Sequence, residues 1–436
     1  MSATIYALSS APGRAGVAVV RVSGPASAAV LRDLCGALPE PRVATLRSLS
    51  AADGAIIDQA LVLWFPGPTS FTGEDVAEFH VHGGRAIVGR LLKAIGGVAD
   101  ARPAEPGAFT RRAVENGKMD LLQAEAIIDL VDAETEAQRR QALGQFGGAL
   151  SDLYEGWRER LLRALAWAEA EIDFSDEELP GGLRGRISSQ LTDIIIEIRN
   201  HLGDGHRGEL VRDGIFLTVI GPPNAGKSSL VNALAKRDVA IVAETAGTTR
   251  DVIEVRLDIG GYEVIVADTA GLREAADAVE SEGVRRALAR AEQSDLVLLL
   301  LDASSTDPLA GLPPRTTEQA DLIVWNKIDL PSPQSRDGVK LSLRTGEGID
   351  KLLEKIGKIV STRLDSARDV PVLTRARHRY ALGEAAAALQ RSLAAKEAEF
   401  FAEELRLAVR AIGRITGRVD VERLLDVVFR DFCIGK

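Results

Sequence analysis

The stretch G-P-P-N-A-G-K-S-S at residues 221–229 decides how this chain is interpreted, because three further motifs follow it in order. They are T-A-G-T-T-R at 245–250, D-T-A-G at 268–271 and N-K-I-D at 326–329. A Gly-x-x-x-x-Gly-Lys-Ser sequence alone predicts no more than a loop that binds phosphate. The four motifs together, spread over the length of about one α/β domain, predict a guanine-nucleotide switch that hydrolyses GTP.

A phosphate-binding loop needs a strand before it and a helix after it, and this chain has both patterns. The apolar run at 215–220 predicts a buried parallel strand, and the spacing from Ser228 to Ala235 predicts a helix. Backbone N–H groups of the loop and the helix N-terminus favour phosphate oxygens. Lys227 is expected to act in catalysis by reaching the β- and γ-phosphates, and the Ser228 hydroxyl to bind Mg²⁺. The nucleotide contacts predicted in this loop are Asn224, Ala225, Gly226, Lys227, Ser228 and Ser229.

The next two motifs are predicted to sense the γ-phosphate. Thr249 is the expected second hydroxyl ligand of Mg²⁺, in a loop that becomes ordered while this phosphate is present. Asp268 follows a predicted strand at 264–267 and is placed to bind the metal shell, while the Gly271 N–H contacts the γ-phosphate. The contacts predicted in these two segments are Ala243, Glu244, Thr245, Ala246, Gly247, Thr248, Thr249, Asp268, Thr269, Ala270 and Gly271.

The N-K-I-D motif follows another apolar strand pattern at 322–325 and predicts selectivity for guanine. The carboxylate of Asp329 can accept hydrogen bonds from guanine N1–H and the exocyclic amine, a pair of donors that adenine lacks. Asn326 and Lys327 are expected to support the loop and the base. A weaker prediction of base contacts, made mostly from position and with an ordinary turn as the alternative, covers Ser342, Leu343 and Arg344.

One departure from many small GTPases concerns catalysis. The position after D-T-A-G, where many of them carry a water-orienting glutamine, is Leu272, whose apolar side chain cannot polarise water. Asn224 can instead bind a monovalent cation near the β–γ bridge, with backbone carbonyls of 242–248 closing over it. The acidic stretch 274–282 offers a carboxylate for the water, with a solvated helix start as the alternative.

Composition limits the class of protein. A chain of 436 residues with 46% hydrophobic residues is long enough for about three globular domains. Its two cysteines, Cys35 and Cys433, predict a reducing compartment. Because neither a signal peptide nor an apolar run of ~18 residues is evident, we expect a cytoplasmic protein without a membrane span. The formal net charge of −10 disfavours binding of nucleic acid by bulk electrostatics.

The residue pattern predicts a multidomain α/β protein. Residues 1–117 carry strand-like alternation, for example at 16–22, and predict an α+β domain. Residues 118–212 and 366–436 have the apolar spacing of a helical bundle. Between them, 213–365 predicts a Ras-like P-loop GTPase domain with a mixed, mostly parallel sheet. We therefore expect a GTPase domain inserted between two halves of one helical domain; two separate helical modules are the alternative.

The chain ends in Cys433-Ile434-Gly435-Lys436, and a cysteine near a terminus is by itself more often incidental than catalytic. Together with the four nucleotide motifs, this ending resembles the MnmE (TrmE) family of tRNA modification GTPases. The resemblance runs over essentially the whole chain. The further blocks that carry it are T-I-Y-A-L-S-S-A-P-G-R-A-G-V-A-V-V-R-V-S-G at 4–24, F-T-G-E-D-V-A-E-F-H-V-H-G-G at 71–84, R-P-A-E-P-G-A-F-T-R-R-A at 102–113, N-G-K-M-D-L-L-Q-A-E-A at 116–126, I-D-F-S-D-E-E at 172–178 and A-E-E-L-R at 402–406.

The resemblance implies a specific activity. Members of this family use GTP hydrolysis while adding an aminomethyl or carboxymethylaminomethyl group to C5 of the wobble uridine, position 34, of certain tRNAs. They act in a heterotetrameric complex with an FAD- and NADH-dependent partner, MnmG (GidA). The one-carbon unit comes from 5,10-methylene- or 5-formyl-tetrahydrofolate bound by the N-terminal domain. That domain also forms the homodimer, and two GTPase domains pair across K⁺ during hydrolysis.

The resemblance also assigns roles to single residues. It gives Glu280 the water-orienting role and makes Cys433 a candidate functional thiol. The folate contacts that it implies are Arg21, Glu78, Lys118 and Lys436. The K⁺ ligands that it implies are Asn224, Ala243, Thr245 and Thr248.

Some N-terminal residues have simpler alternatives. Arg21 and Glu78 can pair with each other on neighbouring strands instead of holding folate. His80 and His82 lie on one face of a predicted strand, where they can bind a metal or, more simply, pack or line a pocket.

Two other functions share the GTPase motifs. One is a ribosome-assembly switch that binds ribosomal RNA, and the other is the cytosolic part of a metal-ion transporter. An assembly GTPase usually carries a basic RNA-binding module, which the acidic composition disfavours, and a transporter needs a membrane segment. The N-terminal and C-terminal blocks favour the modification enzyme over both, because these blocks lie outside the shared GTPase module.

Overall fold

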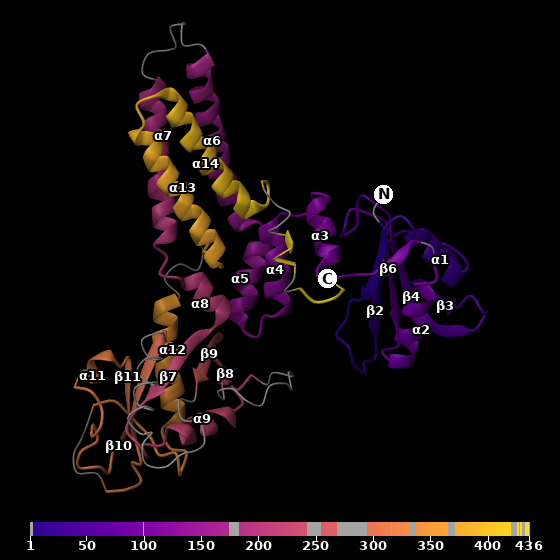
Figure 1. Ribbon diagram of the computed structural model, residues 1–436. Coiled ribbons are helices and arrows are strands. Elements are labelled where there is room, and N and C mark those ends of the chain that lie inside the picture. The colour runs from indigo at the N-terminus through magenta and orange to yellow at the C-terminus, as the bar shows by residue number, and fades with distance from the viewer. Residues whose placement is uncertain are drawn as a thin grey trace. The chain divides into compact units, whose positions relative to one another are not determined.

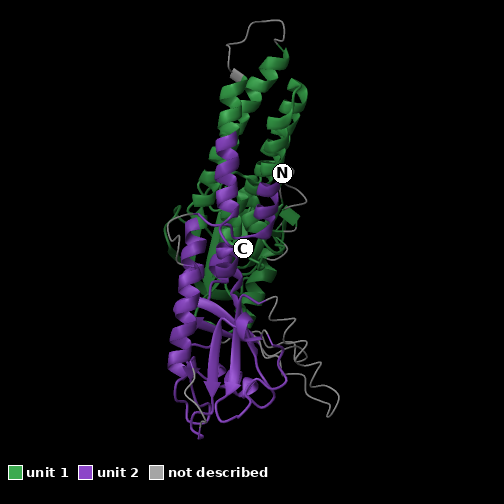
Figure 2. Ribbon diagram, turned by 90° about the vertical axis from the view of Figure 1, so that its left-hand side faces the viewer, with its two compact units in different colours: residues 1–128, 145–191, 384–436 green, residues 129–144, 192–383 purple. Residues whose placement is uncertain are grey.

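The computed structural model divides the chain into two compact units, drawn in Figure 1 and coloured separately in Figure 2. One unit consists of Met1–Ile128, Gln145–Leu191 and Glu384–Lys436, and the other of Asp129–Gly144 and Thr192–Gly383. Each unit therefore combines segments that are distant in the sequence. The four segments expected from the sequence, 1–117, 118–212, 213–365 and 366–436, stay predictions. The residues that the structure describes are 3–98, 100–173, 183–241, 254–267, 294–314, 316–331, 337–364, 371–419, 425–426, 428–429 and 432–435.

The first unit contains a six-stranded sheet in the order β3-β4-β5-β2-β1-β6. Helices α1 (Ser27–Cys35) and α2 (Arg85–Ile95) cover one face, where Val20, Phe79 and Leu31 are fully buried. Strands and helices together confirm the predicted α+β class for this part of the chain. The strands are β1 (Thr4–Leu8), β2 (Ala18–Ser23), β3 (Thr45–Ser50), β4 (Ile56–Phe65), β5 (Val76–Val81) and β6 (Ala101–Pro103).

The segments with helical spacing form long helices. α6 (Ala149–Asp173) buries Tyr154, Trp157 and Leu161, which lie on one face because three and four residues separate them. α14 (Ala398–Thr416) packs along α6 (Figure 1), and its Arg406 pairs with Glu169 of α6 at 3.0 Å. No helix among the described residues is long and apolar enough to cross a membrane. Further helices are α3 (Ala108–Glu115), α4 (Leu121–Val131), α5 (Glu136–Phe146), α7 (Leu183–Leu202) and α13 (Ala376–Ala394).

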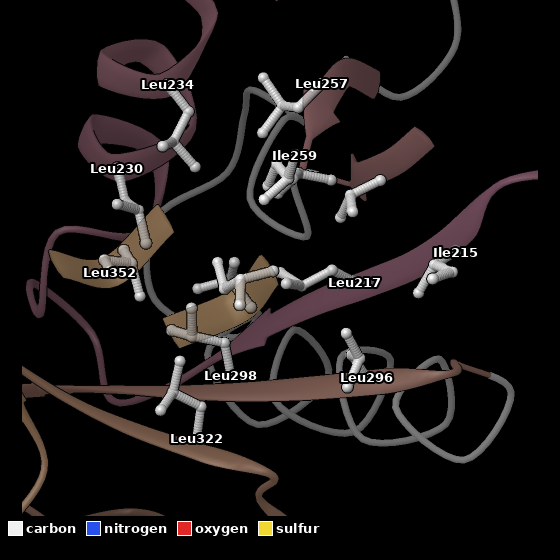
Figure 3. Close-up of a cluster of buried hydrophobic side chains, with 14 of the residues drawn as sticks. Ile215, Leu217, Leu230, Leu234, Leu257, Ile259, Leu296, Leu298, Leu322 and Leu352 are labelled. Atoms are coloured by element: carbon white, nitrogen blue, oxygen red, sulfur yellow. The ribbon is translucent and has the colours of Figure 1, made fainter. Parts of the chain in front are cut away.

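The second unit contains a six-stranded sheet in the order β12-β11-β10-β7-β9-β8. The β8–β9 pair is antiparallel and the other described pairs are parallel, which confirms the mixed, mostly parallel sheet. Leu217, Leu257 and Leu298 of the strands pack with Leu230 and Leu352 of two helices (Figure 3). The elements are α8 (Arg207–Asp213), β7 (Ile215–Ile220), α9 (Lys227–Ala235), β8 (Glu254–Ile259), β9 (Tyr262–Ala267), β10 (Leu296–Asp302), α11 (Thr316–Gln319), β11 (Leu322–Asn326), β12 (Val339–Lys340) and α12 (Ile349–Leu364).

The carboxyl ends of the parallel strands bring distant motif residues to one edge of this sheet. Gly221 follows β7, Asp302 ends β10 and Asn326 ends β11, and these three strands are neighbours in the order β11-β10-β7. In open α/β sheets, ligands bind outside the carboxyl ends of the strands. The edge formed by these residues is therefore where a nucleotide site is expected.

The N-terminus of α5 is part of the hydrophobic core around this sheet, within the same unit. Ala137 is buried in the core cluster, and its N–H donates to the carbonyl of Gly261 at 3.0 Å. Gly260 and Gly261 form the two-residue turn between β8 and β9, with φ of 65° and 85°. Such a turn requires two residues with positive φ, which glycine adopts without strain. The β8–β9 hairpin is therefore attached at its turn to a helix from an earlier part of the chain.

Gln138 makes the polar part of this attachment. Its Nε2 donates to Glu263 Oε2 at 2.7 Å and to the carbonyl of Arg212 at 3.2 Å, and its Oε1 accepts from the Thr135 N–H at 3.0 Å. Glu263 is also buried and pairs with Arg256 at 2.7 Å. Buried polar groups cost free energy unless they are hydrogen-bonded. The Gln138 amide therefore satisfies a buried carboxylate and caps α5 at the same time.

We predict that Gln138→Leu destabilises the second unit by about 1–3 kcal/mol, because it leaves a buried carboxylate oxygen and backbone N–H groups without this partner. Differential scanning calorimetry measures the effect as a lower melting temperature. The control is Arg139→Gln on the next position of α5, which breaks an exposed ion pair with Glu136, with side chains 51% and 53% exposed. Its expected effect on the melting temperature is small, because exposed ion pairs contribute little to stability. Equal melting temperatures for the two variants would contradict the role given to Gln138.

Candidate functional site

The backbone geometry of the loop between β7 and α9 requires glycine at two positions. Gly226 has φ 104°, and a Cβ at this position would lie 2.5 Å from Asn326 Nδ2. A Cβ at Gly221 would lie 2.2 Å from the carbonyl oxygen of Leu300. Larger residues therefore do not fit at either end of the loop without displacing its neighbours.

Two predicted groups of this loop differ in their surroundings. The Lys227 ammonium donates to the carbonyls of Gly221 and Pro222, at 2.9 Å each, and so lies inside the loop. Asn224 is exposed and has φ 61°, a left-handed conformation that asparagine tolerates better than most residues. Ser228 and Ser229 occupy the first turn of α9 beside Lys227. The loop thus offers an ammonium group, an amide and two hydroxyls close together in the chain.

Asn326 connects three segments that the sequence analysis treated separately. Its side chain is 3% exposed, and Nδ2 donates to the carbonyl of Ala225 at 2.8 Å. Its Oδ1 accepts from the Leu343 N–H at 3.2 Å. The structure therefore brings together the phosphate loop, the N-K-I-D motif and the 342–344 segment through one buried amide.

Asp329 contacts the 342–344 segment directly. Ser342 Oγ donates to Asp329 Oδ1 at 2.5 Å, and Arg344 Nε donates to Oδ2 at 2.7 Å. These hydrogen bonds, from Ser342 first and then from Arg344, hold the pKa of the Asp329 carboxyl below its usual range. A carboxylate has about four lone-pair sites. With two of them occupied by the loop, the carboxylate is held in a fixed orientation and can still accept two further hydrogen bonds.

Asp302 is a residue of this edge that the sequence analysis did not select. Its Oδ2 accepts from Lys327 Nζ at 2.6 Å, so the lysine of N-K-I-D points toward the end of the neighbouring strand β10. The sequence pattern that could have indicated Asp302 is the apolar run at 296–301, which predicts a strand and is followed directly by this acidic residue. The pairing itself depends on the parallel register of β10 and β11, in which Asp302 lies opposite Asn326.

Several predicted site residues lie outside the described residues, so their predictions stay as made. They are Ala243, Glu244, Thr245, Ala246, Gly247, Thr248, Thr249, Asp268, Thr269, Ala270, Gly271, Glu280 and Lys436.

In the first unit, the structure pairs two of the four predicted folate residues with each other. Arg21 on β2 lies opposite Glu78 on β5, and its Nε donates to Glu78 Oε1 at 2.9 Å. The guanidinium also lies over the rings of Phe71 and Phe109, 5.3 and 5.8 Å from their centroids. The aliphatic part of Lys118 lies beside Gly73. Arg21 and Glu78 thus form the ion pair that was their simpler alternative, and both side chains are mostly buried, 21% and 16% exposed.

The two histidines of this strand region have carboxylate partners. His80 Nε2 lies 3.3 Å from Glu78 Oε2, and His82 Nδ1 lies 2.9 Å from Asp58 Oδ1. Among the described residues, no three His, Cys, Asp or Glu side chains are grouped as metal ligands. A pocket of about 520 Å³ between α1, the β3–β4 turn and α2 is lined by Leu34 and Arg90, among others, and contains none of the predicted residues.

The C-terminal segment packs against the N-terminal part of the same unit. The carbonyl of Cys433 accepts from the Gly107 N–H at 3.3 Å, and Ile434 forms a β-bridge with Pro106. A Cβ at Gly435 would lie 2.2 Å from the Leu8 carbonyl oxygen, so the backbones approach closely here. The Cys433 side chain is exposed. Its thiol is therefore held at a defined place and remains accessible.

We predict that Asn326→Ala raises the dissociation constant for GDP about 30-fold, since it removes two buried hydrogen bonds of about 1 kcal/mol each. Titration with a fluorescent GDP analogue measures the change. Lys340→Ala on the neighbouring strand β12, where the side chain is exposed, is the control and should bind like the wild type. An Asn326→Ala variant that is folded and binds GDP like the control would show that the three loops do not depend on this amide.

Comparison with known proteins agrees with these observations. Residues 4–118 match the family model described as the GTP-binding protein TrmE N-terminus, and residues 121–433 match that of the MnmE helical domain. Among solved structures, the G domain of the T. maritima FeoB iron transporter is 26% identical, with a TM-score of 0.26. It covers 33% of this chain and 97% of its own.

Curated relatives match over the full length. The protein from Parvibaculum lavamentivorans named tRNA modification GTPase MnmE is 55% identical over 99% of this chain and 100% of its own. The protein of the same name from Maricaulis maris is 52% identical over 100% of both chains. These matches cover the N-terminal part, the helical segments and the GTPase domain together. The chain belongs to the MnmE (TrmE) family of tRNA modification GTPases.

Proposed function

We propose that this GTPase is the GTP-hydrolysing subunit of a cytoplasmic complex that modifies C5 of the wobble uridine of tRNA. The observation that carries the nucleotide part is the convergence of the phosphate loop, Asn326 and Asp329 at one edge of the parallel sheet. The family relationship supports the tRNA part. The group added is an aminomethyl or carboxymethylaminomethyl group, and the one-carbon unit comes from tetrahydrofolate.

In this proposal the phosphate loop and the N-K-I-D edge divide the work of binding GTP. Lys227 contacts the β- and γ-phosphates, leaving the two loop carbonyls to which it now donates. Ser228 provides a hydroxyl oxygen, a ligand type that Mg²⁺ accepts, and Mg²⁺ neutralises phosphate charge when it is bound. Asp329, already held by Ser342 and Arg344, accepts the two donors of the guanine edge.

Catalysis in this proposal does not use a glutamine, because Leu272 occupies the position where many small GTPases have one. Asn224 is exposed on the loop and offers an amide oxygen, which suits a monovalent cation such as K⁺. Ala243, Thr245 and Thr248 would provide its further ligands, and the bound cation would supply positive charge for the phosphates. Glu280 orients the attacking water. Pairing of two GTPase domains completes this arrangement in the homodimer.

The one-carbon chemistry is proposed for the first unit. Arg21, Glu78 and Lys118 bind tetrahydrofolate together with Lys436, the guanidinium or ammonium groups pairing with its glutamate tail and the carboxylate with its pterin edge. Phe71 beside Arg21, which is partly exposed, provides apolar surface for a flat ring system. Cys433 is the candidate thiol for the modification step. An FAD- and NADH-dependent partner, MnmG (GidA), supplies redox chemistry and, given the net charge of −10, most of the tRNA contact.

We predict that cells lacking this protein lose C5-aminomethyl-type modifications of wobble uridine. Mass spectrometry of tRNA nucleosides measures this loss directly. The wild-type gene should restore the modified uridines, and a Lys227→Ala copy should not, because it lacks the ammonium group that contacts the phosphates. Unchanged wobble uridines in the deletion strain would refute the modification role and favour a ribosome-assembly GTPase.

We predict that Asn224→Ala abolishes stimulation of GTP hydrolysis by K⁺ while nucleotide binding is largely retained. The reason is that the amide oxygen is lost whereas Lys227 and Asp329 are unchanged. Hydrolysis rates in KCl and in NaCl at equal ionic strength measure the effect, with Asp350→Asn on α12 as a surface control. Equal rates of the variant and the wild type in KCl would contradict the cation role.

A further inference from the structure

Asp302 and Ser304 form an anchored carboxylate at the end of β10. Asp302 Oδ1 accepts from the Ser304 N–H at 2.9 Å and from Ser304 Oγ at 2.6 Å. Asp302 Oδ2 accepts from Lys327 Nζ at 2.6 Å. The backbone next to the ion pair is also hydrogen-bonded. The N–H of Ala303, which follows Asp302, donates to the carbonyl of Asn326, which precedes Lys327, at 2.8 Å. Both oxygens of the carboxylate therefore have partners, and one of those partners is the lysine of N-K-I-D.

This ion pair is partly shielded from solvent. The Asp302 and Lys327 side chains are 22% and 33% exposed. Burial by itself raises the pKa of the Asp302 carboxyl, but the hydrogen bonds from Lys327 and Ser304 outweigh it and lower the pKa below its usual range. Asp302 is thus ionised near neutral pH and attracts the ammonium group. Ordering a free lysine side chain costs about 2 kcal/mol of rotamer entropy. Because the ion pair with Asp302 already orders the Lys327 side chain, a ligand does not have to do so when it binds.

The strand order gives this arrangement a direction. β10 lies between β11, which ends in N-K-I-D, and β7, which leads into the phosphate loop. The Lys327 side chain starts after β11 and reaches the carboxyl end of β10. It therefore extends from the residues proposed to bind the base toward the phosphate loop. Lys327 also has φ 65°, a left-handed conformation that is uncommon outside glycine and directs its side chain differently from a strand residue.

We propose that Asp302 and Ser304 are positioning residues for guanine nucleotides. They hold the Lys327 side chain in one conformation across the edge of the sheet where the nucleotide is proposed to bind, so that the side chain is already placed to pack against the base. This inference rests on the nucleotide site proposed above. It assigns Lys327 a contact through its aliphatic part, with its charge already neutralised by Asp302. Preorganisation raises affinity by removing the cost of ordering a flexible side chain upon binding.

The test compares Asp302→Asn, Ser304→Ala, Lys327→Met and the double variant Asp302→Asn/Lys327→Met in the full-length protein. Titration with a fluorescent GDP analogue gives the dissociation constants. We expect Asp302→Asn and Lys327→Met each to raise the constant for GDP about tenfold, which corresponds to about 1.4 kcal/mol, and Ser304→Ala to raise it by a smaller factor. The double variant should be no weaker than either single variant, because both remove the same contact.

Two controls separate positioning from other roles. Asp350→Asn removes the same charge from the same unit, at a side chain that is 84% exposed and paired with Arg237, and should leave the constant unchanged. Competition by uncharged guanosine distinguishes geometry from electrostatics. A positioning role predicts the same fold-change for guanosine as for GDP, whereas loss of a repelling carboxylate would strengthen GDP binding and leave guanosine unaffected.

The inference is overturned if Asp302→Asn leaves GDP binding unchanged or strengthens it. It is also overturned if the losses of the two single variants add in the double variant. A lowered melting temperature that parallels the loss of affinity would assign Asp302 a structural role instead. Failure of the wild type to bind GDP, or normal binding by Asp329→Asn, would refute the nucleotide site itself, which is a separate outcome.

Discussion

The nucleotide edge of this protein depends on the buried side-chain amide of Asn326. It donates to the carbonyl of Ala225 in the phosphate loop and accepts from the N–H of Leu343, and so joins three loops that are far apart in the sequence. A buried amide with both ends satisfied stabilises a single arrangement, because any movement of one loop leaves a polar group without a partner. Gly226 belongs to the same constraint, since only a residue without a side chain leaves room for this amide.

Near this amide, the charged residues that are proposed to contact the base form ion pairs with other residues of the chain. Asp329 pairs with Arg344, and Lys327 pairs with Asp302. Lys227 donates to backbone carbonyls inside the phosphate loop. Its ammonium group thus lies at the end of the edge where the phosphates are proposed to bind, while the residues proposed to bind the base select by hydrogen-bond geometry. This division suits a ligand whose charge is confined to one end.

The β8–β9 hairpin links this edge to the helical segments. β8 begins at Glu254, shortly after T-A-G-T-T-R, and β9 ends at Ala267, directly before D-T-A-G. Its turn is attached to α5 through Ala137 and the Gln138–Glu263 hydrogen bond. The two motifs predicted to sense the γ-phosphate therefore flank a hairpin whose far end contacts a helix encoded much earlier in the chain.

The sequence by itself determined the nucleotide chemistry and the class of fold. The signals that sufficed are four motifs in order, strand-like runs before three of them, and a change to helical spacing on both sides. These signals are local, because a glycine, a lysine or an apolar period acts within a few residues. Only the tertiary structure decided which side chains share a hydrogen bond. The Asp302–Lys327 pair depends on the register of two parallel strands, the contacts of Asn326 on three loops meeting, and the Gln138–Glu263 bond on a helix packing against a distant hairpin. The sequence allowed an Arg21–Glu78 ion pair as an alternative to folate binding. Only the antiparallel register of β2 and β5 shows that the two residues lie opposite each other. Such contacts are set by packing between segments far apart in the chain, and no local pattern of residues encodes them.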